Sequence, residues 1–250
     1  MRRALALLLV LAGLLPARAD FPAPPQVEYQ NVPYDGRFTF ARIKYRPARW
    51  RPGDYAWGLD LGWNHDYPRA EAHFLKILEE TTSVDPNMSG NILGLDEPEL
   101  FKYPVAYMCE PGFWTMTDEE AAALRAYLLK GGFLIVDDMT ERDVFNLEEQ
   151  LGRALPGARF QELTTAHPIF DSFFRIETPP AFHPYRRGLL SSYQAIFEDN
   201  DPAKRMLVIA NFNNDMTEYW EWSDTGFLPI DLSNDAYKLG VNYVVYGMTH

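Results

Sequence analysis

Acidic residues stand at the ends of two apolar stretches of the sequence. Asp137 and Asp138 directly follow residues 133–136, and Glu110 lies just beyond a second such stretch. Both stretches have the composition of buried strands, and open α/β sheets bind ligands at the carboxyl ends of their strands. Together with His167, these carboxylates could hold a divalent cation or perform acid–base chemistry. One hypothesis is therefore an acid- or metal-dependent hydrolase centred on Asp137, Asp138 and His167.

The same carboxylates also have a structural interpretation. Successive residues of an extended chain point to opposite sides, so only one of Asp137 and Asp138 is expected to face a ligand crevice. The other is expected to accept hydrogen bonds from backbone N–H groups of the next segment. The spacing of these acids and His167 matches no defined metal motif, so the sequence predicts no metal site and no cofactor. The favoured interpretation is a non-catalytic protein that binds a partner or a small ligand at this edge.

Four further residues are candidates for ligand binding. His65 could contact a ligand, whereas Asp66, which stands shortly before a proline, is expected to cap a helix. Trp114 and Trp220 fall in predicted loops, where exposed rings stack on sugars or grip a partner protein. Carbohydrate binding is accordingly a further alternative, and packing over the sheet edges is the competing explanation for the two rings.

Cys109 is the only cysteine of the chain, so no internal disulfide can form. It ends an apolar stretch, between Met108 and Glu110. A cysteine in such a position is typically a small core residue. We therefore expect Cys109 to be buried and chemically inert.

The hydrophobic pattern predicts strands that alternate with helices. Strands are expected over residues 38–45, 55–63, 105–108, 133–136, 159–163 and 206–210, and residues 92–95 are a short apolar piece. The mixed polarity of residues 38–45 is typical of an edge strand. Helices are expected after Asp66, after a capping box at Thr117, over 144–155, and after a cap at Ser233. This alternation predicts an α/β fold, a three-layer αβα sandwich with helices on both faces of a largely parallel sheet.

The charge and the N-terminus restrict the partners and the compartment. The 250 residues carry 23 Lys and Arg against 35 Asp and Glu, a net charge of −12, which argues against nucleic-acid binding. Residues 1–19 combine two arginines, an apolar run and Ala17-Arg18-Ala19, which is typical of a signal peptide cleaved after Ala19. The run is shorter than a membrane span, so we expect no stable membrane insertion and a periplasmic or secreted protein. Residues 20–37 then form an extended lead-in, and residues 38–250 a single α/β domain.

Four segments resemble the bacterial DUF4159 family, a domain of unknown function. They occur in the order of the family and comprise Trp63-Asn64-His65-Asp66-Tyr67-Pro68-Arg69-Ala70, residues 117–138, residues 167–174 and residues 239–246. The resemblance implies a class I glutamine amidotransferase-like, flavodoxin-like α/β sandwich. It implies no particular activity, because the family has none assigned.

The resemblance does not extend to amidotransferase chemistry. Enzymes of that kind carry a nucleophilic cysteine on a tight turn between a strand and a helix. Here Asp137-Asp138-Met139 follows the corresponding strand, and this turn holds no thiol. The sequence therefore favours a binding protein over a glutaminase, with an unknown protein or small molecule as its ligand.

Overall fold

The computed structural model describes residues 30–47, 61–182 and 190–250. Its strands are β1 (Ala41–Ile43), β2 (Arg46–Pro47), β3 (Asn91–Leu93), β4 (Val105–Cys109), β5 (Trp114–Thr115), β6 (Phe133–Asp137), β7 (Gln161–Glu162), β8 (Ser192–Phe197) and β9 (Met206–Phe212). Its α-helices are α1 (Arg69–Thr81), α2 (Asp118–Leu129), α3 (Glu141–Ala154), α4 (Met216–Glu221) and α5 (Ile230–Thr249). The expected signal peptide, residues 1–19, lies outside the described residues.

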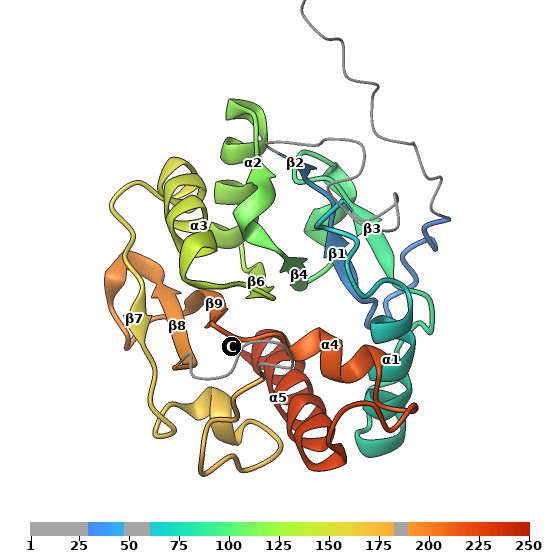
Figure 1. The fold of residues 1–250 in the computed structure, drawn as a ribbon. Helices are drawn as coiled ribbons and strands as arrows, with labels where there is room; N and C mark the ends of the chain where they lie inside the picture. The colour runs from blue at the N-terminus through green and yellow to red at the C-terminus, as the bar shows by residue number, and fades with distance from the viewer. Residues whose placement is uncertain (1–29, 48–60, 183–189) are drawn as a thin grey trace, which may run out of the picture.

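A seven-stranded sheet in the order β3-β1-β4-β6-β9-β8-β7 forms the centre of the molecule (Figure 1). The five adjacent strands β3, β1, β4, β6 and β9 run parallel to one another. Strand β8 is antiparallel to both of its neighbours, β9 and β7. Numbered in chain order, the five parallel strands lie in the order 2-1-3-4-5. The direction of the strand order therefore reverses between β1 and β4. The mostly parallel sheet expected from the sequence is confirmed.

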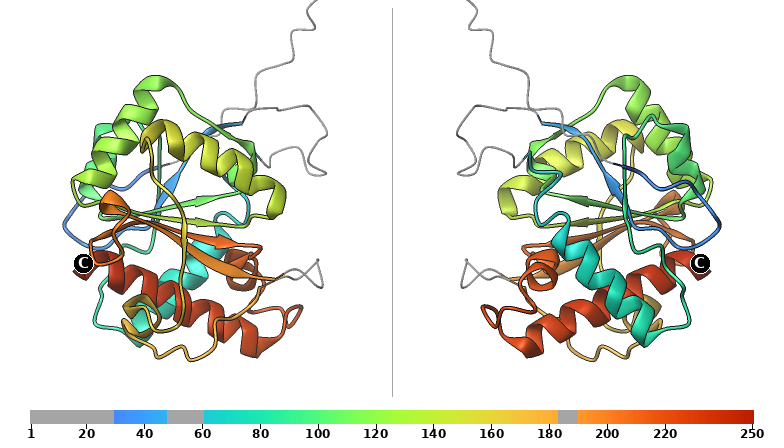
Figure 2. Two further views of the ribbon diagram at one scale, coloured as in Figure 1. Left: turned by 90° about the vertical axis from the view of Figure 1, so that its left-hand side faces the viewer. Right: turned by 90° about the vertical axis from the view of Figure 1, so that its right-hand side faces the viewer.

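Helices cover both faces of the sheet (Figure 2). Because alternate residues of a strand point to opposite faces, β4 contributes to two cores. Val105 and Tyr107 belong to the core beneath α1, α4 and α5. Ala106 and Met108 belong to the core beneath α2 and α3. This arrangement is compatible with a three-layer sandwich.

Several predicted elements are present at the expected positions. Helix α2 begins at a capping box, in which Thr117 Oγ1 accepts from the backbone N–H of Glu120 at 3.1 Å, and Glu120 accepts from the backbone N–H of Thr117 at 2.5 Å. The strands predicted over 105–108 and 133–136 are each one residue longer. These two strands carry Glu110 and Asp138 at their carboxyl ends, so the sequence located this edge of the sheet correctly.

Strand β1 is not at an edge, contrary to the prediction. It pairs with β3 on one side and with β4 on the other. Its polar member, Arg42, is buried in an ion pair with Glu71 of α1, and its Nη1 donates to the carbonyl oxygen of Trp63 at 2.9 Å. The mixed polarity therefore reflects a buried ion pair rather than exposure to solvent.

Other predicted boundaries also differ from the structure. The strand expected over 55–63 lies mostly outside the described residues, and its last three residues are not in a strand. Helix α5 begins at Ile230, so Ser233 lies within its first turn and does not cap it. Strand β8 and helix α4 were not predicted. Helix α4 packs closely on α5. A Cβ atom added at Gly240 of α5 would lie only 2.3 Å from the ring of Trp220 in α4.

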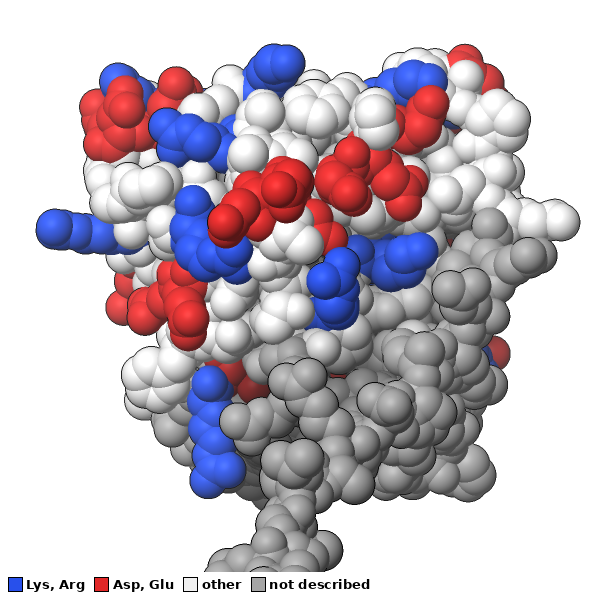
Figure 3. Space-filling view, turned by 90° about the horizontal axis from the view of Figure 1, so that it is seen from above, with Lys and Arg blue, Asp and Glu red and all other residues white. Residues whose placement is uncertain are grey.

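The surface over α2 and α3 carries interspersed basic and acidic side chains rather than a field of one sign (Figure 3). On the described part of this face, the basic side chains form no continuous path for a phosphate backbone. Among the described residues, no helix has both the length and the apolar character needed to cross a bilayer.

Candidate functional site

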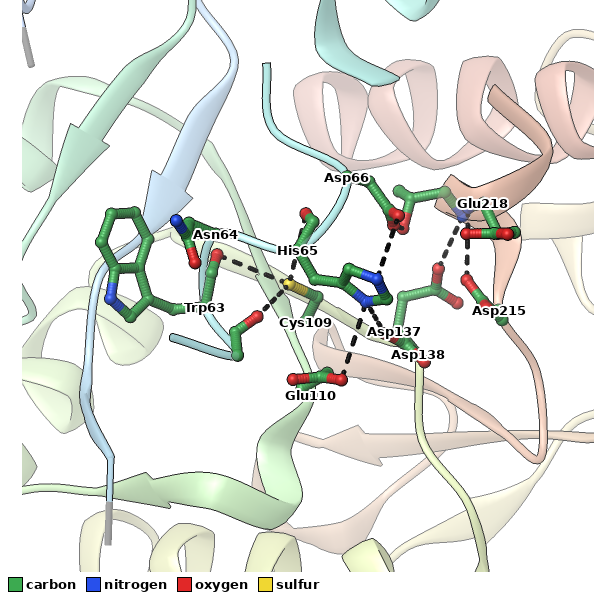
Figure 4. A network of polar contacts seen from close by, with 12 residues as sticks. Trp63, Asn64, His65, Asp66, Cys109, Glu110, Asp137, Asp138, Asp215 and Glu218 are labelled. Carbon is green, nitrogen blue, oxygen red and sulfur yellow. Dashed lines mark hydrogen bonds and ion pairs between the residues drawn. The ribbon is translucent and has the colours of Figure 1, made fainter. Parts of the chain in front are cut away.

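Polar side chains from separate connections meet at the carboxyl ends of the parallel strands (Figure 4). They lie before α1, after β4, after β6 and in α4, and they are His65, Asp66, Glu110, Asp138 and Glu218. The cluster lies close to the point at which the strand order reverses, between β1 and β4. Open α/β sheets bind their ligands at such a point.

Three of the acids have a left-handed backbone conformation. The angle φ is 63° at Asp66, 45° at Glu110 and 51° at Asp138. Residues other than glycine rarely adopt this conformation, which costs on the order of 1 kcal/mol or more. All three carboxylates face the same imidazole, that of His65.

His65 is surrounded by carboxylates. Its Nδ1 lies 3.0 Å from Asp138 Oδ2 and 3.6 Å from Glu110 Oε1, and its Nε2 lies 3.8 Å from Asp66 Oδ1. Burial alone would lower the pKa of His65, but the hydrogen bond to Asp138 and the charges of Asp66 and Glu110 raise it to about 12. His65 is therefore an imidazolium at neutral pH and cannot serve as a general base.

Asp66 does not cap α1, contrary to the prediction. Among the described residues, no side chain caps this helix, which begins after Pro68. The Asp66 side chain is instead fully buried, and its Oδ2 accepts from Thr217 Oγ1 at 2.6 Å. No described residue donates a hydrogen bond to the other oxygen, Oδ1. Burial raises the pKa of Asp66, and the nearby charge of His65 opposes that shift.

The two consecutive acids at the end of β6 have different environments. Asp137 Oδ1 accepts from Asn211 Nδ2 at 2.7 Å, and its Oδ2 accepts from the backbone N–H groups of Met216 at 2.8 Å and Thr217 at 3.2 Å. Burial nevertheless raises the pKa of Asp137 to about 7. Asp138 points into the cluster instead. Asp137 thus fixes the first turn of α4, and Asp138 belongs to the site.

A second acidic group adjoins the first through Asp66. Carboxylate oxygens of Asp66, Glu218 and Glu221 lie within 4.8 Å of one another. Asp66 and Glu218 are buried, and Glu221 is half-buried. Burial, followed by the charges of Asp66 and Glu218, raises the pKa of Glu221 to about 7. Three carboxylates this close repel one another, and a cation between them would remove the repulsion.

Comparison with known protein families identifies the chain. A family described as a domain of unknown function, DUF4159, matches residues 39–248, which is most of the sequence. The chain belongs to the DUF4159 family. Among curated proteins, no significant match was found. Two of the four segments that resemble DUF4159 contribute to the site. Residues 63–70 include His65 and Asp66, and residues 117–138 include Asp138 and Asp137, the residue that holds the first turn of α4.

The DUF4159 fold does not bring His167 to the cluster. The imidazole of His167 lies 5.7 Å from the ring of Tyr246, and Tyr246 in turn contacts Phe133, the first residue of β6. His167 is therefore at the amino edge of the parallel strands, opposite the edge that carries the acids. The chain after β7 leads into a 3-10 turn, Pro168–Asp171, that packs against α5. The set Asp137, Asp138 and His167 is consequently not assembled.

The two tryptophans proposed for ligand binding are core residues of the DUF4159 domain. Trp114 is fully buried in the core beneath α2 and α3. Trp220 is also buried, and its ring stacks on Phe74 with a centroid distance of 4.3 Å. Neither ring is available to stack on a sugar, so packing explains both positions.

Cys109 is buried, as the sequence predicts. Its sulfur accepts from Arg42 Nη1 at 2.9 Å, and the thiol donates to the carbonyl oxygen of Gly62 at 3.1 Å. Burial raises the pKa of the Cys109 thiol well above its ordinary value, so the thiol is protonated at neutral pH. A protonated, buried thiol is a poor nucleophile.

Replacing Cys109 with serine is therefore expected to have a small effect. The serine hydroxyl can accept from Arg42 and donate to Gly62, so we expect a loss of about 1 kcal/mol in the free energy of unfolding and no loss of ligand binding. Urea unfolding of the purified variant measures this change. Rapid labelling of Cys109 by a thiol reagent in the native protein would contradict the buried assignment.

Two acids of the site, Glu218 and Glu221, were missed by sequence reasoning. Both belong to α4, a helix of six residues that follows a polar and aromatic stretch. The signal that could have found them is their spacing, because residues three apart lie on the same side of a helix. Recognising the helix itself requires the contacts that Asp137 makes with its first turn.

Proposed function

We propose that this DUF4159 protein binds a positively charged ligand at the carboxyl edge of its sheet. The observation that carries the proposal is the convergence of five carboxylates at this edge, three of them directly around His65 and two more next to Asp66. These carboxylates are Asp66, Glu110, Asp138, Glu218 and Glu221. The side chains of Asp138 and Glu110 are 17% and 19% exposed, so the cluster is open to solvent at its rim and buried behind it. A cation that enters from the rim therefore meets several carboxylates within a short distance of one another.

Binding is better supported than acid–base hydrolysis. His65 is protonated at neutral pH, and both oxygens of Asp137 already accept hydrogen bonds from Asn211 and the start of α4. Neither group is free to abstract a proton from a substrate. A non-catalytic role at this edge is therefore the function that the geometry supports best.

We propose a flavodoxin-like, glutamine amidotransferase-like fold for a single domain over residues 38–250. The strand order 2-1-3-4-5 supports this proposal, because it is the order of doubly wound flavodoxin-like sheets. In that fold ligands bind where the strand order reverses. The position of His65 and Glu110 near β1 and β4 agrees with such a site.

Thermal unfolding in the presence of small ions tests the proposed function. We expect the melting temperature of the full chain to rise with the concentration of a cation, either putrescine or a divalent metal, and not with succinate at the same ionic strength. Glu110→Gln removes one rim charge and is expected to weaken the response. Glu149→Gln, an exposed position on α3, is the matched control and should respond like the wild type. A rise with succinate, or none with any cation, would refute the proposal.

We also propose that the protein is exported to the periplasm or secreted. The short apolar run and Ala17-Arg18-Ala19 support cleavage before Asp20. N-terminal sequencing of the protein recovered from its own cells tests this, since full-length protein retained in the membrane fraction would contradict it.

A further inference from the structure

We infer that the carboxyl edge of the sheet is a docking surface for a second polypeptide, one that presents a lysine or arginine between apolar side chains. This inference rests on the proposed function, because the basic side chain of the partner is then the positively charged ligand. It goes beyond a small cation, because the partner must also cover apolar surface beside the carboxylates.

The most exposed large apolar side chains gather at this edge. Among the described residues, four such side chains are more than half exposed, and they are Phe145 at 75%, Leu190 at 88%, Phe227 at 61% and Ile230 at 73%. The other exposed large apolar side chains in the described ranges reach only 42–46%. A single exposed apolar residue is ordinary, whereas several of them at one edge mark an interaction site.

Two of the four side chains belong to helices that begin at the carboxyl edge. Phe145 lies near the start of α3, the helix that follows the carboxyl end of β6. Ile230 is the first residue of α5, which runs back to the opposite edge, where Tyr246 contacts Phe133 at the start of β6. Figure 2 shows the beginnings of both helices on the same side of the molecule, away from the C-terminus.

The other two side chains lie in connections at the same edge. Phe227 is in the connection between α4 and α5, shortly before Ile230. The carbonyl oxygen of Leu190 accepts from Asn213 Nδ2 at 3.0 Å, and Asn213 directly follows the last residue of β9. All four apolar side chains therefore surround the edge that carries the carboxylates.

The carboxylates at this edge indicate the charge of the partner. The side chains of Asp138 and Glu110 are 17% and 19% exposed, and Glu221 is half-buried. Asp231, next to Ile230, is exposed. Within the described ranges, neither Glu221 nor Asp231 forms an ion pair. A lysine or arginine that enters here gains ion pairs, whereas an acidic segment is repelled.

The same charge argues against a second copy of this chain as the partner. In a symmetric dimer the same surface patch of each copy meets the other, so the carboxylates of the two copies would face each other. The net charge of −12 adds to that repulsion. A basic segment of a different protein avoids it, and its apolar side chains can pack against the exposed rings and aliphatic chains as anchors.

Selection from a phage-displayed library of random dodecapeptides on the immobilised full chain tests the inference. We expect the enriched peptides to carry at least one lysine or arginine flanked by aromatic or aliphatic residues. Fluorescence polarisation of one enriched peptide, made synthetically, then gives its dissociation constant. In Phe145→Ser/Ile230→Ser we expect at least tenfold weaker binding. Its melting temperature should stay close to that of the wild type, because both side chains are exposed.

Phe101→Ser/Leu129→Ser is the matched control. These apolar side chains are 42% and 43% exposed, and they lie away from the carboxyl edge, since Leu129 ends α2 and Phe101 packs on Tyr127 of the same helix. This variant should bind the peptide like the wild type. Equal weakening in the two double variants, or no weakening in Phe145→Ser/Ile230→Ser, would overturn the docking surface.

The remaining outcomes separate this inference from the proposed function. No enrichment, or enriched peptides without a basic residue, would overturn the inference. If putrescine still raises the melting temperature in that case, the cationic ligand stands without a polypeptide partner. If neither putrescine nor any metal ion raises the melting temperature and no basic peptide binds, both proposals fall together.

Discussion

Replacing Arg42 with leucine is expected to lower the free energy of unfolding by about 3–5 kcal/mol. Arg42 and Glu71 are 1% and 4% exposed in their side chains, so the substitution leaves a carboxylate buried without its cation. It also removes the donor to the carbonyl oxygen of Trp63 and to Cys109. Denaturant unfolding, with the slope compared between variants, measures the change.

The double variant Arg42→Leu/Glu71→Leu shows whether the buried charge is the cause. Removing both partners leaves no uncompensated charge, so we expect it to recover at least half of the lost stability. The exposed ion pair between Lys238 and Asp235, whose side chains are each 45% exposed, is the control. Lys238→Ala is expected to lower the free energy of unfolding by no more than about 1 kcal/mol. A double variant as unstable as Arg42→Leu would show that packing, and not charge, explains the loss.

Replacing Asp137 with alanine is expected to destabilise the protein by about 3 kcal/mol or more, which lowers the melting temperature by roughly 6–12 °C. The substitution leaves Asn211 Nδ2 and the N–H groups of Met216 and Thr217 buried without their acceptor. Because these two N–H groups begin α4, amide exchange should be accelerated across that helix. Hydrogen exchange followed by mass spectrometry measures this local effect.

Asp138→Ala is the matched control for Asp137→Ala, since the two residues are adjacent and chemically identical. Asp138 makes its contact with His65 in a partly solvated position, so we expect its loss to change the unfolding free energy by about 1 kcal/mol or less. Equal destabilisation by both substitutions would contradict the assignment of Asp137 as a structural residue and Asp138 as a residue of the site.

The sequence predicts the parallel part of the fold because that part follows local rules. Residues 133–136 are uniformly apolar, and a strand buried on both faces requires this. The capping box at Thr117 determines the start of α2 within four residues of chain. Strand β1 was misplaced at an edge because Arg42 finds its partner, Glu71, only in the folded molecule. Charge in a strand is ambiguous until its partner is known.

The candidate site was predicted in part for the same reason. Glu110 and Asp138 follow recognisable strands, so their shared edge can be inferred from the parallel order. His167 was expected there too, but the direction taken by the chain after β7 depends on packing against α5. Asp66 was read as a cap because its neighbouring proline predicts a helix start, and nothing local reveals that its side chain turns inward to Thr217.

The opposite orientations of Asp137 and Asp138 limit how this pair can change in evolution. Position 137 must accept two backbone N–H groups and an amide in a closed space, so we expect relatives to retain aspartate there, with asparagine as its nearest substitute. Position 138 needs only a group that can hold an imidazolium at the rim, so glutamate with a shifted backbone is an acceptable replacement. Deleting one residue of β6 would exchange the orientations of the two side chains. A lineage with that deletion would lose both the hydrogen bonds that hold the start of α4 and the carboxylate that contacts His65.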